Sequence, residues 1–423
     1  MTPSIRLLGK RRFLPLFITQ FLGAFNDNLF RMAMVILVTY HIYSDPAKEA
    51  SFTALAGAIF ILPFFLFSAL AGQLADSTDK ARIIRIVKTA EIIIMVAGAA
   101  GLLLQSIPLM LLALFAMGVH STFFGPIKYA ILPQHLRKDE VLGGTGLVEA
   151  GTYCAILLGT ITGGLISSVA AAGAVLLVAG AGRLAGGQVP PAPPETDVPL
   201  PKMDWHIIRS SITLVSDTLH IPRLFLAIIA ISFFWAQGAV LAALFPPLVK
   251  NVFAANEQVA TLFLAIFSVG VALGSVLINR LLAGRVSARY SPAASIFMGL
   301  FILHLYWNVK HWPVPQGTLM DFWTFVKLPR AEWVMFDLFG VAIAGGMFVV
   351  PLYAFLTTTV HISKTARTVA ANNIVNSGGM VLAAILFSAM VQAGLSVAET
   401  LLLVAVSSLG AAWLAWKLHL ACD

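Results

Sequence analysis

The sequence predicts an all-α membrane protein whose twelve transmembrane helices form two six-helix bundles. The first observation is composition, because 59% of the 423 residues are hydrophobic, only 11% are charged, and the mean hydropathy is +0.90. No soluble core could hide that much apolar surface from water. The second observation is that apolar windows of roughly twenty or more residues recur twelve times. The third is a proline-rich break after the sixth window.

The first half of the chain predicts an N-terminal bundle over residues 1–189. Its first window carries the polar string FNDNLFR through its middle and is too long for a cleavable signal peptide, so we expect it to span the membrane. The sixth window is the least regular, because Arg183 and several glycines interrupt it. The six windows lie at about residues 13–42, 52–75, 83–104, 107–132, 141–167 and 169–189.

Residues 190–221 are predicted to be a cytoplasmic linker followed by a surface helix. Six prolines between residues 190 and 201 cannot continue a helix and favour an extended chain. The string WHIIRSSITLVSDTLHIP then places four apolar residues on one helical face, Ile208, Ile212, Val215 and Leu219. Such a helix is expected to lie on the membrane surface.

The second half predicts a C-terminal bundle over residues 222–423. Its windows lie at about residues 222–249, 258–279, 290–308, 332–356, 367–393 and 396–418. With the N-terminus inside, the inner segments hold 20 Lys and Arg residues and the outer loops hold 5. Positive charge gathers on the cytoplasmic side, so both termini are expected to be cytoplasmic.

Charge and cysteine content exclude several other classes of protein. The net charge of +8 comes from short basic clusters between apolar segments, as membrane topology requires, so we expect no nucleic-acid partner. Cys154 and Cys422 offer no disulfide framework or metal spacing. We expect no metal and no cofactor.

Signs of enzyme activity are also weak. A lipid acyltransferase would need a His followed by an Asp after four intervening residues. The nearest string, HLRKDE, has Asp139 one position early and Glu140 in the Asp position. Phosphate-binding loops and nucleophile elbows are missing too. The protein is predicted not to be an enzyme.

The loop between the second and third windows predicts a gating element. Twelve spans in two halves suit a transporter whose bundles move around a central site. The string GQLADSTDKAR resembles the loop signature of the major facilitator superfamily, although Ser77, Asp79 and Ala81 depart from it. Gly72 would allow close helix approach, Asp76 could accept from helix-terminal amides or a basic neighbour, and Arg82 closes the motif. The alternative is a solvated charged loop.

Polar residues within the first window predict a substrate path. Asp27 is followed one turn later by Arg31, so the two can pair, and Asn26 and Asn28 widen the polar surface. An ionisable group at membrane depth is a functional candidate by default. A structural ion pair between Asp27 and Arg31 is the alternative.

The fourth and fifth windows predict a second charged pair. The string FFGPIKYAILP combines a Gly-Pro break with Lys128, and GLVEAGTYCAIL places Glu149 at similar depth with Tyr153 on its face. A Lys128–Glu149 pair would bridge neighbouring helices, and its opening would expose a cation to an anionic head group. The alternative is a lysine that extends to the interface. Glu91 and Lys88 are expected to pair at a cytoplasmic helix end.

The second half offers weaker candidates. Gln237 stands ahead of Pro246 and Pro247, and helix-to-helix hydrogen bonding is as good an interpretation as substrate contact. Asn372 and Asn376 share one helical face, and for them too helix-to-helix hydrogen bonding and substrate contact are equally good interpretations. Asp337 lies near the outer interface, which favours a structural role.

Five strings together resemble the bacterial lysophospholipid transporter family of the major facilitator superfamily: FITQFLGAFNDNLFR, GQLAD, GPIKYAILPQHL, GLVEAGTYCAILLGTITGGL and GGMFVVPLYAFL. The resemblance implies a flippase that moves lysophosphatidylethanolamine and lysophosphatidylglycerol from the outer to the inner leaflet of the bacterial inner membrane for reacylation. It also implies charged groups at Asp27, Lys128 and Glu149. One departure is Ala242, where an Arg is expected in stand-alone members. This stretch looks more like the transporter segment that other bacteria fuse to acyltransferase and acyl-carrier-protein synthetase domains.

We therefore expect a monomeric, multi-pass lysophospholipid transporter in the inner membrane, with an acyltransferase or acyl-carrier-protein synthetase as partner. The expected substrate-binding residues are Asp27, Asn28, Arg31, Lys128, Glu149, Tyr153, Gln237, Asn372 and Asn376, and the gating residues are Gly72, Asp76 and Arg82. Two alternatives stay open. One is a proton-coupled exporter of amphipathic drugs, and the other is a scaffold that recruits an acyltransferase without transport.

Overall fold

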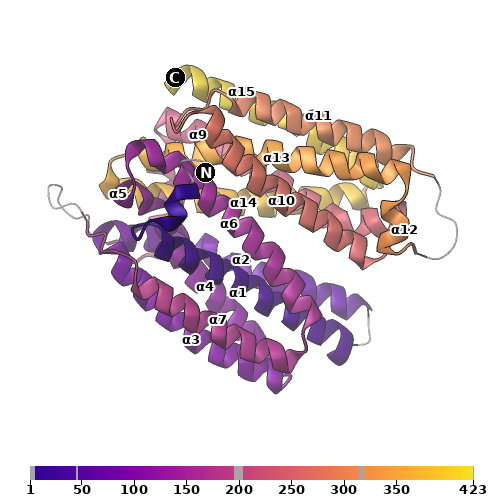
Figure 1. Ribbon diagram of the computed structural model, residues 1–423, viewed down its shortest axis with the longest axis horizontal. Coiled ribbons are helices and arrows are strands. Elements are labelled where there is room, and N and C mark those ends of the chain that lie inside the picture. The colour runs from indigo at the N-terminus through magenta and orange to yellow at the C-terminus, as the bar shows by residue number, and fades with distance from the viewer. Residues whose placement is uncertain (1–4, 44–45, 195–202, 314–318, 423) are drawn as a thin grey trace. The chain divides into compact units, whose positions relative to one another are not determined.

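The computed structural model describes residues 5–43, 46–194, 203–313 and 319–422, and these residues are almost entirely helical (Figure 1). Within these ranges, the only strand-type pairing is an isolated bridge between Ala255 and Met320. The proline-rich stretch is described up to Pro194, and the rest of it, residues 195–202, lies outside the described residues.

Twelve long helices within the described ranges correspond one to one with the twelve predicted windows. Those of the first half are α1 (Leu14–Leu37), α2 (Pro46–Ser77), α3 (Lys80–Leu103), α4 (Ile107–Ala130), α6 (Lys138–Leu165) and α7 (Ser168–Gly187). Those of the second half are α9 (Pro222–Pro247), α10 (Glu257–Leu281), α11 (Ser291–Lys310), α13 (Pro329–Thr358), α14 (Thr365–Gln392) and α15 (Val397–Cys422). The predicted fold class is confirmed.

Eleven helical stretches in the described part of the chain are long and apolar enough to cross a membrane. The long helix that falls outside this group is α1, because its polar residues lower its mean hydropathy. Shorter elements join the long ones: η1 (Ile5–Gly9), η2 (Val38–Ile42), α5 (Leu132–His135), α8 (Ile207–Leu219), η3 (Leu248–Val252), α12 (Phe322–Val326) and η4 (Ile362–Lys364).

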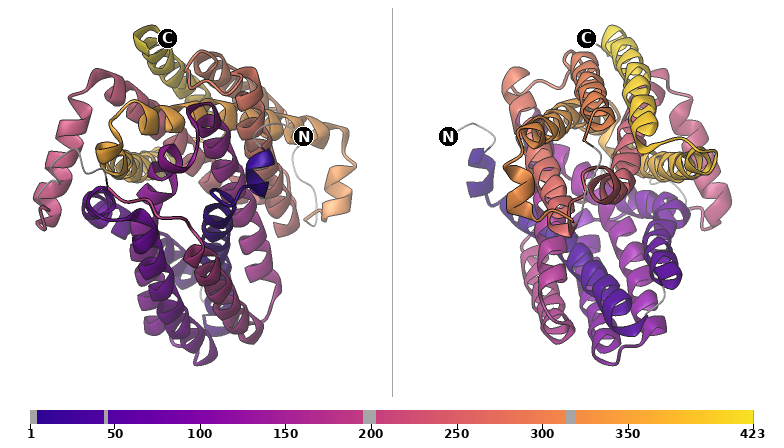
Figure 2. Two further views of the ribbon diagram at one scale, coloured as in Figure 1. Left: turned by 60° about the vertical axis from the view of Figure 1, so that its left-hand side comes forward. Right: turned by 90° about the vertical axis from the view of Figure 1, so that its right-hand side faces the viewer.

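The chain divides into two compact units. The first comprises Met1–Leu219 together with Leu356–Ile374, and the second comprises His220–Phe355 together with Val375–Asp423. In the first unit α1 packs against α6 and α7, α3 packs against α4 and α7, and α2 packs against α4 and α8. In the second unit α15 lies alongside both α9 and α11 (Figure 2).

Small residues allow the closest helix pair of the first unit to form. A Cβ added at Gly159 of α6 would lie 2.3 Å from the Phe25 carbonyl oxygen of α1, and one added at Gly163 would lie 2.4 Å from the Leu29 carbonyl oxygen. These distances are far below van der Waals contact, so only glycine lets α1 and α6 approach this closely.

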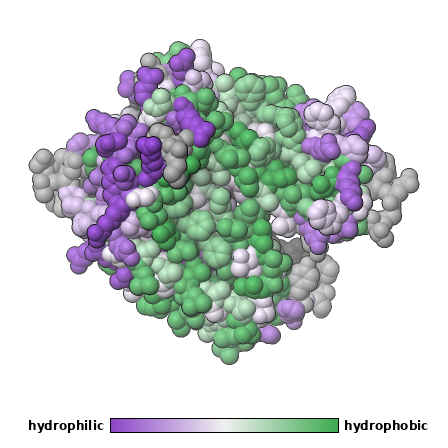
Figure 3. All heavy atoms as spheres, viewed as in Figure 1, coloured by the Kyte–Doolittle hydropathy of each residue, from purple (hydrophilic) through white to green (hydrophobic). Residues whose placement is uncertain are grey.

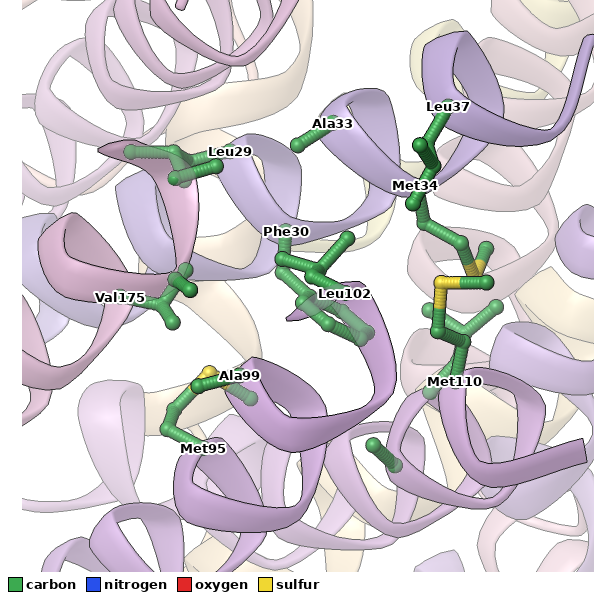
Figure 4. Packing of buried hydrophobic residues seen from close by; sticks show 14 of the residues in the cluster. Leu29, Phe30, Ala33, Met34, Leu37, Met95, Ala99, Leu102, Met110 and Val175 are labelled. Atoms are coloured by element: carbon green, nitrogen blue, oxygen red, sulfur yellow. The ribbon is translucent and has the colours of Figure 1, made fainter. Parts of the chain in front are cut away.

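An apolar cluster of buried residues joins α1, α2, α3, α4 and α7 of the first unit. Side chains from α1, α3, α4 and α7 converge there, including Phe30, Met95, Met110 and Val175 (Figure 4). Outward-facing residues of α6 and α7 are also apolar, and hydrophobic side chains cover much of the face these helices present in Figure 3. A face of this kind is expected where a helix meets lipid.

The predicted break at Gly125–Pro126 is wrong, because α4 continues through Pro126 to Ala130. A proline inside a helix leaves one carbonyl without its usual donor, but the flanking turns keep their helical geometry here. A helix, α8, follows the linker, and its place on the membrane surface stays a prediction. Its residues Ile208 and Ile212 are 65% exposed, while Ser210 and Thr218 are buried.

Candidate functional site

Asp27 lies in the middle of α1 and faces α4. Its Oδ2 atom accepts a hydrogen bond of 2.6 Å from Ser121 Oγ, and its buried Oδ1 atom has no hydrogen-bond partner among the described residues. Arg31 donates to Asn28 Oδ1 at 2.7 Å and lies over the Phe60 ring, 5.8 Å from its centroid. Within the described ranges no ion pair joins Asp27 and Arg31, so the structural ion pair that was the alternative for these two residues is not seen.

The reason lies in the neighbouring helices. One helical turn would let Asp27 and Arg31 meet, but hydrogen-bonding partners on α4 and within α1 take up their polar atoms instead. Asp27 therefore keeps an unpaired carboxylate oxygen inside the first unit. Such a group costs free energy when buried and is commonly kept for a function.

A buried charged cluster lies beside Asp27. Lys88 and Glu91 of α3 form an ion pair in which both side chains are 1% exposed. Asn26 of α1 donates to Glu91 Oε1 at 3.0 Å, and His120 Nε2 of α4 lies 3.2 Å from Glu91 Oε2. Lys88 and Glu91 were expected to pair at a helix end; they do pair, but in the interior of the unit.

The contribution of His120 to this cluster was missed by the sequence analysis. A signal was present, since a histidine in the middle of an apolar window is unusual. The sequence does not reveal, however, that α4 turns this residue toward Glu91 of α3. The residues next to His120 in the sequence lie in the same apolar window. Its partner on another helix could therefore be identified only from the packing of the helices.

A second polar cluster contains Lys128 and Glu149. Tyr129 of α4 donates a hydrogen bond to Glu149 of α6, and Lys128 Nζ lies 3.5 Å from Thr152 Oγ1. Thr152 also donates to Gln20 Oε1 of α1 at 3.0 Å. The cluster thus joins α1, α4 and α6.

The predicted Lys128–Glu149 ion pair does not form within 4 Å, because the Tyr129 hydroxyl occupies the carboxylate. Lys128 nevertheless lies close enough to both Glu149 and Asp27 for their charges to act on it. Its ammonium rests over the Tyr129 ring at 4.8 Å from the centroid. Tyr153, one turn after Glu149 on α6, is 8% exposed.

The loop candidates meet the start of α14 within the first unit. Asp76 accepts hydrogen bonds of 3.0 Å from the backbone amides of Ala366 and Arg367 and from Arg367 Nε. A Cβ at Gly72 would lie 2.9 Å from Arg367 Cα, so the two chains touch closely. Arg82 is exposed. In the described ranges it forms no hydrogen bond or ion pair with Asp76.

The candidates of the second half lie in helix-to-helix contacts. Gln237 of α9 donates to Ser407 Oγ at 2.7 Å and Ser408 Oγ at 3.1 Å on α15. Asn376 accepts from Ser232 Oγ at 2.7 Å and lies 3.4 Å from the Tyr353 hydroxyl. Asn372 belongs to the first unit and is buried, and neither of its side-chain polar atoms has a hydrogen-bond partner among the described residues.

Asp337 is held in place by α11. His304 Nδ1 lies 2.7 Å from Asp337 Oδ1, and Asn308 donates to Oδ2 at 2.9 Å. A carboxylate with both oxygens engaged matches a structural role. Across the described residues, no group of three or more His, Cys, Asp or Glu side chains could hold a metal ion.

Comparison with known proteins agrees with this architecture. The family model of the Major Facilitator Superfamily matches residues 16–384. Lysophospholipid transporter LplT of Enterobacter sp. (strain 638) is 26% identical over 385 residues, covering 89% of this chain and 88% of that protein. Its counterpart from Pectobacterium carotovorum subsp. carotovorum (strain PC1) is 27% identical over 385 residues, covering 90% and 86%.

A solved structure gives the same result for the fold. The human organic anion transporter MFSD10 (TETRAN) superimposes with a TM-score of 0.73 at 13% identity, covering 99% of this chain and 100% of that chain. At this identity the likeness concerns the fold alone. The matched family model and the shared helical architecture both extend over most of the chain, which therefore belongs to the Major Facilitator Superfamily.

Proposed function

We propose that the protein is a lysophospholipid transporter that moves lysophosphatidylethanolamine and lysophosphatidylglycerol from the outer to the inner leaflet of the bacterial inner membrane, by alternating access, for reacylation. The relatives named as lysophospholipid transporters, at 26–27% identity over about nine tenths of the chain, support this substrate class. The observation that carries the proposal is a pair of opposite charges on adjoining helices, the buried Asp27 and the half-buried Lys128, neither of which is held in an ion pair in the described structure.

These two groups suit the head group of a lysophospholipid. The free Oδ1 of Asp27 is proposed to accept a hydrogen bond from an ethanolamine ammonium. Lys128, whose polar contact with Thr152 is a long 3.5 Å, is proposed to bind the phosphate. Glu149 would then act through Tyr129, which already donates to it, and would attract Lys128 when the phosphate leaves. Asn28, Arg31 and Tyr153 complete this proposed site.

The contact between Asp76 and the start of α14 is proposed to act as a latch. The Asp76 carboxylate binds two backbone amides at a helix N-terminus together with the Arg367 side chain, which is a favourable arrangement for an anion. Release of this carboxylate would free the start of α14 for a conformational change. Gly72 contributes by allowing the close approach, and Arg82 remains a gating candidate.

Uptake by the purified protein alone tests the proposal. Labelled lysophosphatidylethanolamine is added to proteoliposomes, and its arrival in the inner leaflet is followed by protection from an impermeant quencher. Protein-dependent arrival is expected. Its absence would favour a scaffold that acts only with an acyltransferase, and strong competition by amphipathic drugs would favour a drug exporter.

A further inference from the structure

A series of polar side chains joins Asp27 to the buried ion pair of α3. Ser121 Oγ lies 2.6 Å from Asp27 Oδ2 and 3.4 Å from His120 Nδ1. On the other side of the imidazole, His120 Nε2 lies 3.2 Å from Glu91 Oε2. The series therefore runs from α1 through α4 to α3 without leaving the first unit.

The charges along this series leave one proton to be shared. Lys88 and Glu91 compensate each other as an ion pair. Arg31 and Lys128 are further cations near Asp27, but Arg31 is engaged by Asn28 and Lys128 rests over a tyrosine ring. Asp27 and His120 remain as the two titratable groups of this series that could share a proton.

If these two groups share a proton, they are either both neutral or both ionised. The net charge of the cluster is the same in both cases. Moving the proton between them therefore avoids leaving a single uncompensated charge in the interior, which is the costly alternative.

The hydrogen-bond geometry accommodates both positions of the proton. His120 Nε2 lies 3.2 Å from Glu91 Oε2 without the alignment of a hydrogen bond, and because an ionised Glu91 can only accept, a hydrogen is assigned to Nε2 and Nδ1 is left as an acceptor. When Asp27 is protonated, its hydroxyl donates to Ser121, whose own hydroxyl donates to His120 Nδ1. When the proton has moved, Nδ1 donates to Ser121, and Ser121 donates to the Asp27 carboxylate. One O–H bond breaks at Asp27 and one N–H bond forms at His120.

We propose that Asp27, Ser121 and His120 form a proton-transfer path, and that His120 holds the proton that Asp27 loses when an ammonium head group binds. The proposal rests on the proposed function, in which Asp27 faces the ammonium of lysophosphatidylethanolamine. An ammonium and a proton compete for the same carboxylate, because a protonated Asp27 cannot form an ion pair. With its proton on His120, the site carries the lipid and one proton together, and the proton is cotransported.

His120 is also connected to a second region of the first unit. It lines a cavity of about 540 Å³ between α2, α3 and α4, together with Thr78 and Arg82 near the turn that joins α2 to α3. By the predicted topology this turn is cytoplasmic. Apart from His120, Thr78 and Arg82, the lining of this cavity is apolar.

The experiment measures proton and lipid movement in the same vesicles. Proteoliposomes contain a trapped pH indicator, and labelled lysophosphatidylethanolamine is added outside. Wild-type protein is expected to acidify the lumen by about one proton for each lysolipid taken up, as the shared proton requires. His120→Gln keeps a donor for Glu91 but cannot hold the proton, so acidification is expected to fall to the level of protein-free vesicles.

Two variants of neighbouring residues separate a path from a structural role. Ser121→Ala removes the bridging hydroxyl and is expected to lose the proton signal, while Ser121→Thr restores it. Thr122→Val is the neighbouring control, because the Thr122 hydroxyl is buried but donates to the Gly118 carbonyl of its own helix. Its proton-to-lipid ratio is expected to equal that of wild type. Each variant is compared by its unfolding temperature in detergent, which identifies loss of folding.

The outcomes distinguish this proposal from the proposed function. Lysolipid uptake by wild-type protein without acidification, or equal acidification by His120→Gln, would overturn the path and leave the transporter standing. Absence of lysolipid uptake by folded wild-type protein would overturn both. A His120→Gln variant that takes up lipid but moves no protons would support the path most directly.

Discussion

Individual residues in the interior of the first unit carry the chemistry proposed for this protein. Asp27 is buried and Lys128 is half-buried, and neither has an ion-pair partner in the described structure, whereas Glu91 and Asp337 have their carboxylates fully engaged. The first pair is therefore available to a ligand, and the second pair is expected to be structural. Substitutions that remove charge but keep shape test this division.

Asp27→Asn is expected to reduce uptake of lysophosphatidylethanolamine strongly while leaving folding intact. Asn can still accept the hydrogen bond from Ser121, so the packing is retained. The ammonium loses its ionised partner, and a charge-assisted contact of about 1.5–3 kcal/mol corresponds to roughly a tenfold or greater loss of uptake. Uptake and unfolding temperature are measured together.

A second substitution tests the structural alternative for Asp27. Because Arg31 donates to Asn28, adding Arg31→Gln to Asp27→Asn is not expected to restore the protein. If the single variant disappeared from the membrane and the double variant returned, an Asp27–Arg31 ion pair would be supported instead.

Lys128→Gln and Glu149→Gln are expected to differ in their effect. Lys128→Gln should lose lysolipid binding, most severely for lysophosphatidylglycerol, whose only charge is the phosphate. Glu149→Gln should bind at least as well as wild type but turn over more slowly, because Lys128 loses the anion that attracts it away from the phosphate. Binding is measured by equilibrium titration in detergent and turnover in proteoliposomes. Equal loss of binding in both variants would contradict this exchange.

Tyr129→Phe provides the matched comparison at this cluster. It leaves Glu149 charged but removes its donor, so a destabilisation of about 1.5–3 kcal/mol is expected, with lysolipid binding retained. An effect on binding as large as that of Lys128→Gln would indicate that Tyr129 itself contacts the ligand.

At the scale of elements, close backbone contact determines how the helices of the first unit pack. Two glycines of α6 lie against carbonyl oxygens of α1, and this contact positions Asp27 relative to α4. Asp76 similarly joins the end of α2 to the start of α14. Both contacts are predicted to be sensitive to small changes.

Gly159→Ala is expected to destabilise the protein by about 1–3 kcal/mol, because its Cβ would lie 2.3 Å from the Phe25 carbonyl oxygen and α1 must move. The unfolding temperature in detergent measures the effect. Gly173→Ala in α7 is the control, since a Cβ there meets nothing within 4 Å. It should be neutral or stabilise the helix by about 0.5–1 kcal/mol. Equal stability of the two variants would refute the close-contact argument.

Asp76→Asn is expected to weaken the contact with the start of α14 and to slow transport. Double-mutant cycles with Arg367→Gln should give a coupling of about 1.5–3 kcal/mol in unfolding free energy, because the carboxylate binds both the side chain and the backbone amides of that turn. Arg82→Gln is the comparison, and a smaller effect on stability is expected because Arg82 is exposed. Additivity of Asp76→Asn and Arg367→Gln would speak against a latch.

At the scale of the whole molecule, the arrangement of basic residues predicts the orientation in the membrane. The predicted inner segments hold 20 Lys and Arg residues and the outer loops hold 5. This imbalance is large, so both termini and the linker are expected in the cytoplasm. The proposed direction of transport, from the outer to the inner leaflet, depends on this orientation.

Cysteine labelling in intact cells checks the orientation. A Pro194→Cys variant in a background without Cys154 and Cys422 should resist an impermeant thiol reagent until the cells are opened. A cysteine at Lys250, in a predicted outer loop, is the positive control. Ready labelling at position 194 from outside would reverse the topology and the assigned depth of Lys128.

The sequence by itself determined the helices, their number and the membrane environment. These depend on local composition, since a run of apolar residues long enough to span the bilayer must satisfy its backbone hydrogen bonds as a helix. The sequence also singled out Asp27, Lys128 and Glu149, because ionisable groups are rare and costly in such runs. The Gly125–Pro126 break was wrong because the turns on either side of the proline hold α4 in helical form.

The tertiary structure alone decided which polar groups meet. Arg31 turns to Asn28, Tyr129 takes the Glu149 carboxylate, and His120 lies between Ser121 and Glu91. Each of these hydrogen-bond partners either lies on another helix or replaces a partner that sequence spacing had predicted. Spacing within one helix carries no information about which residues a neighbouring helix presents. The rotation of α4 against α1 and α3 sets these contacts, and that rotation follows from packing of apolar side chains and glycines over the whole length of the helices.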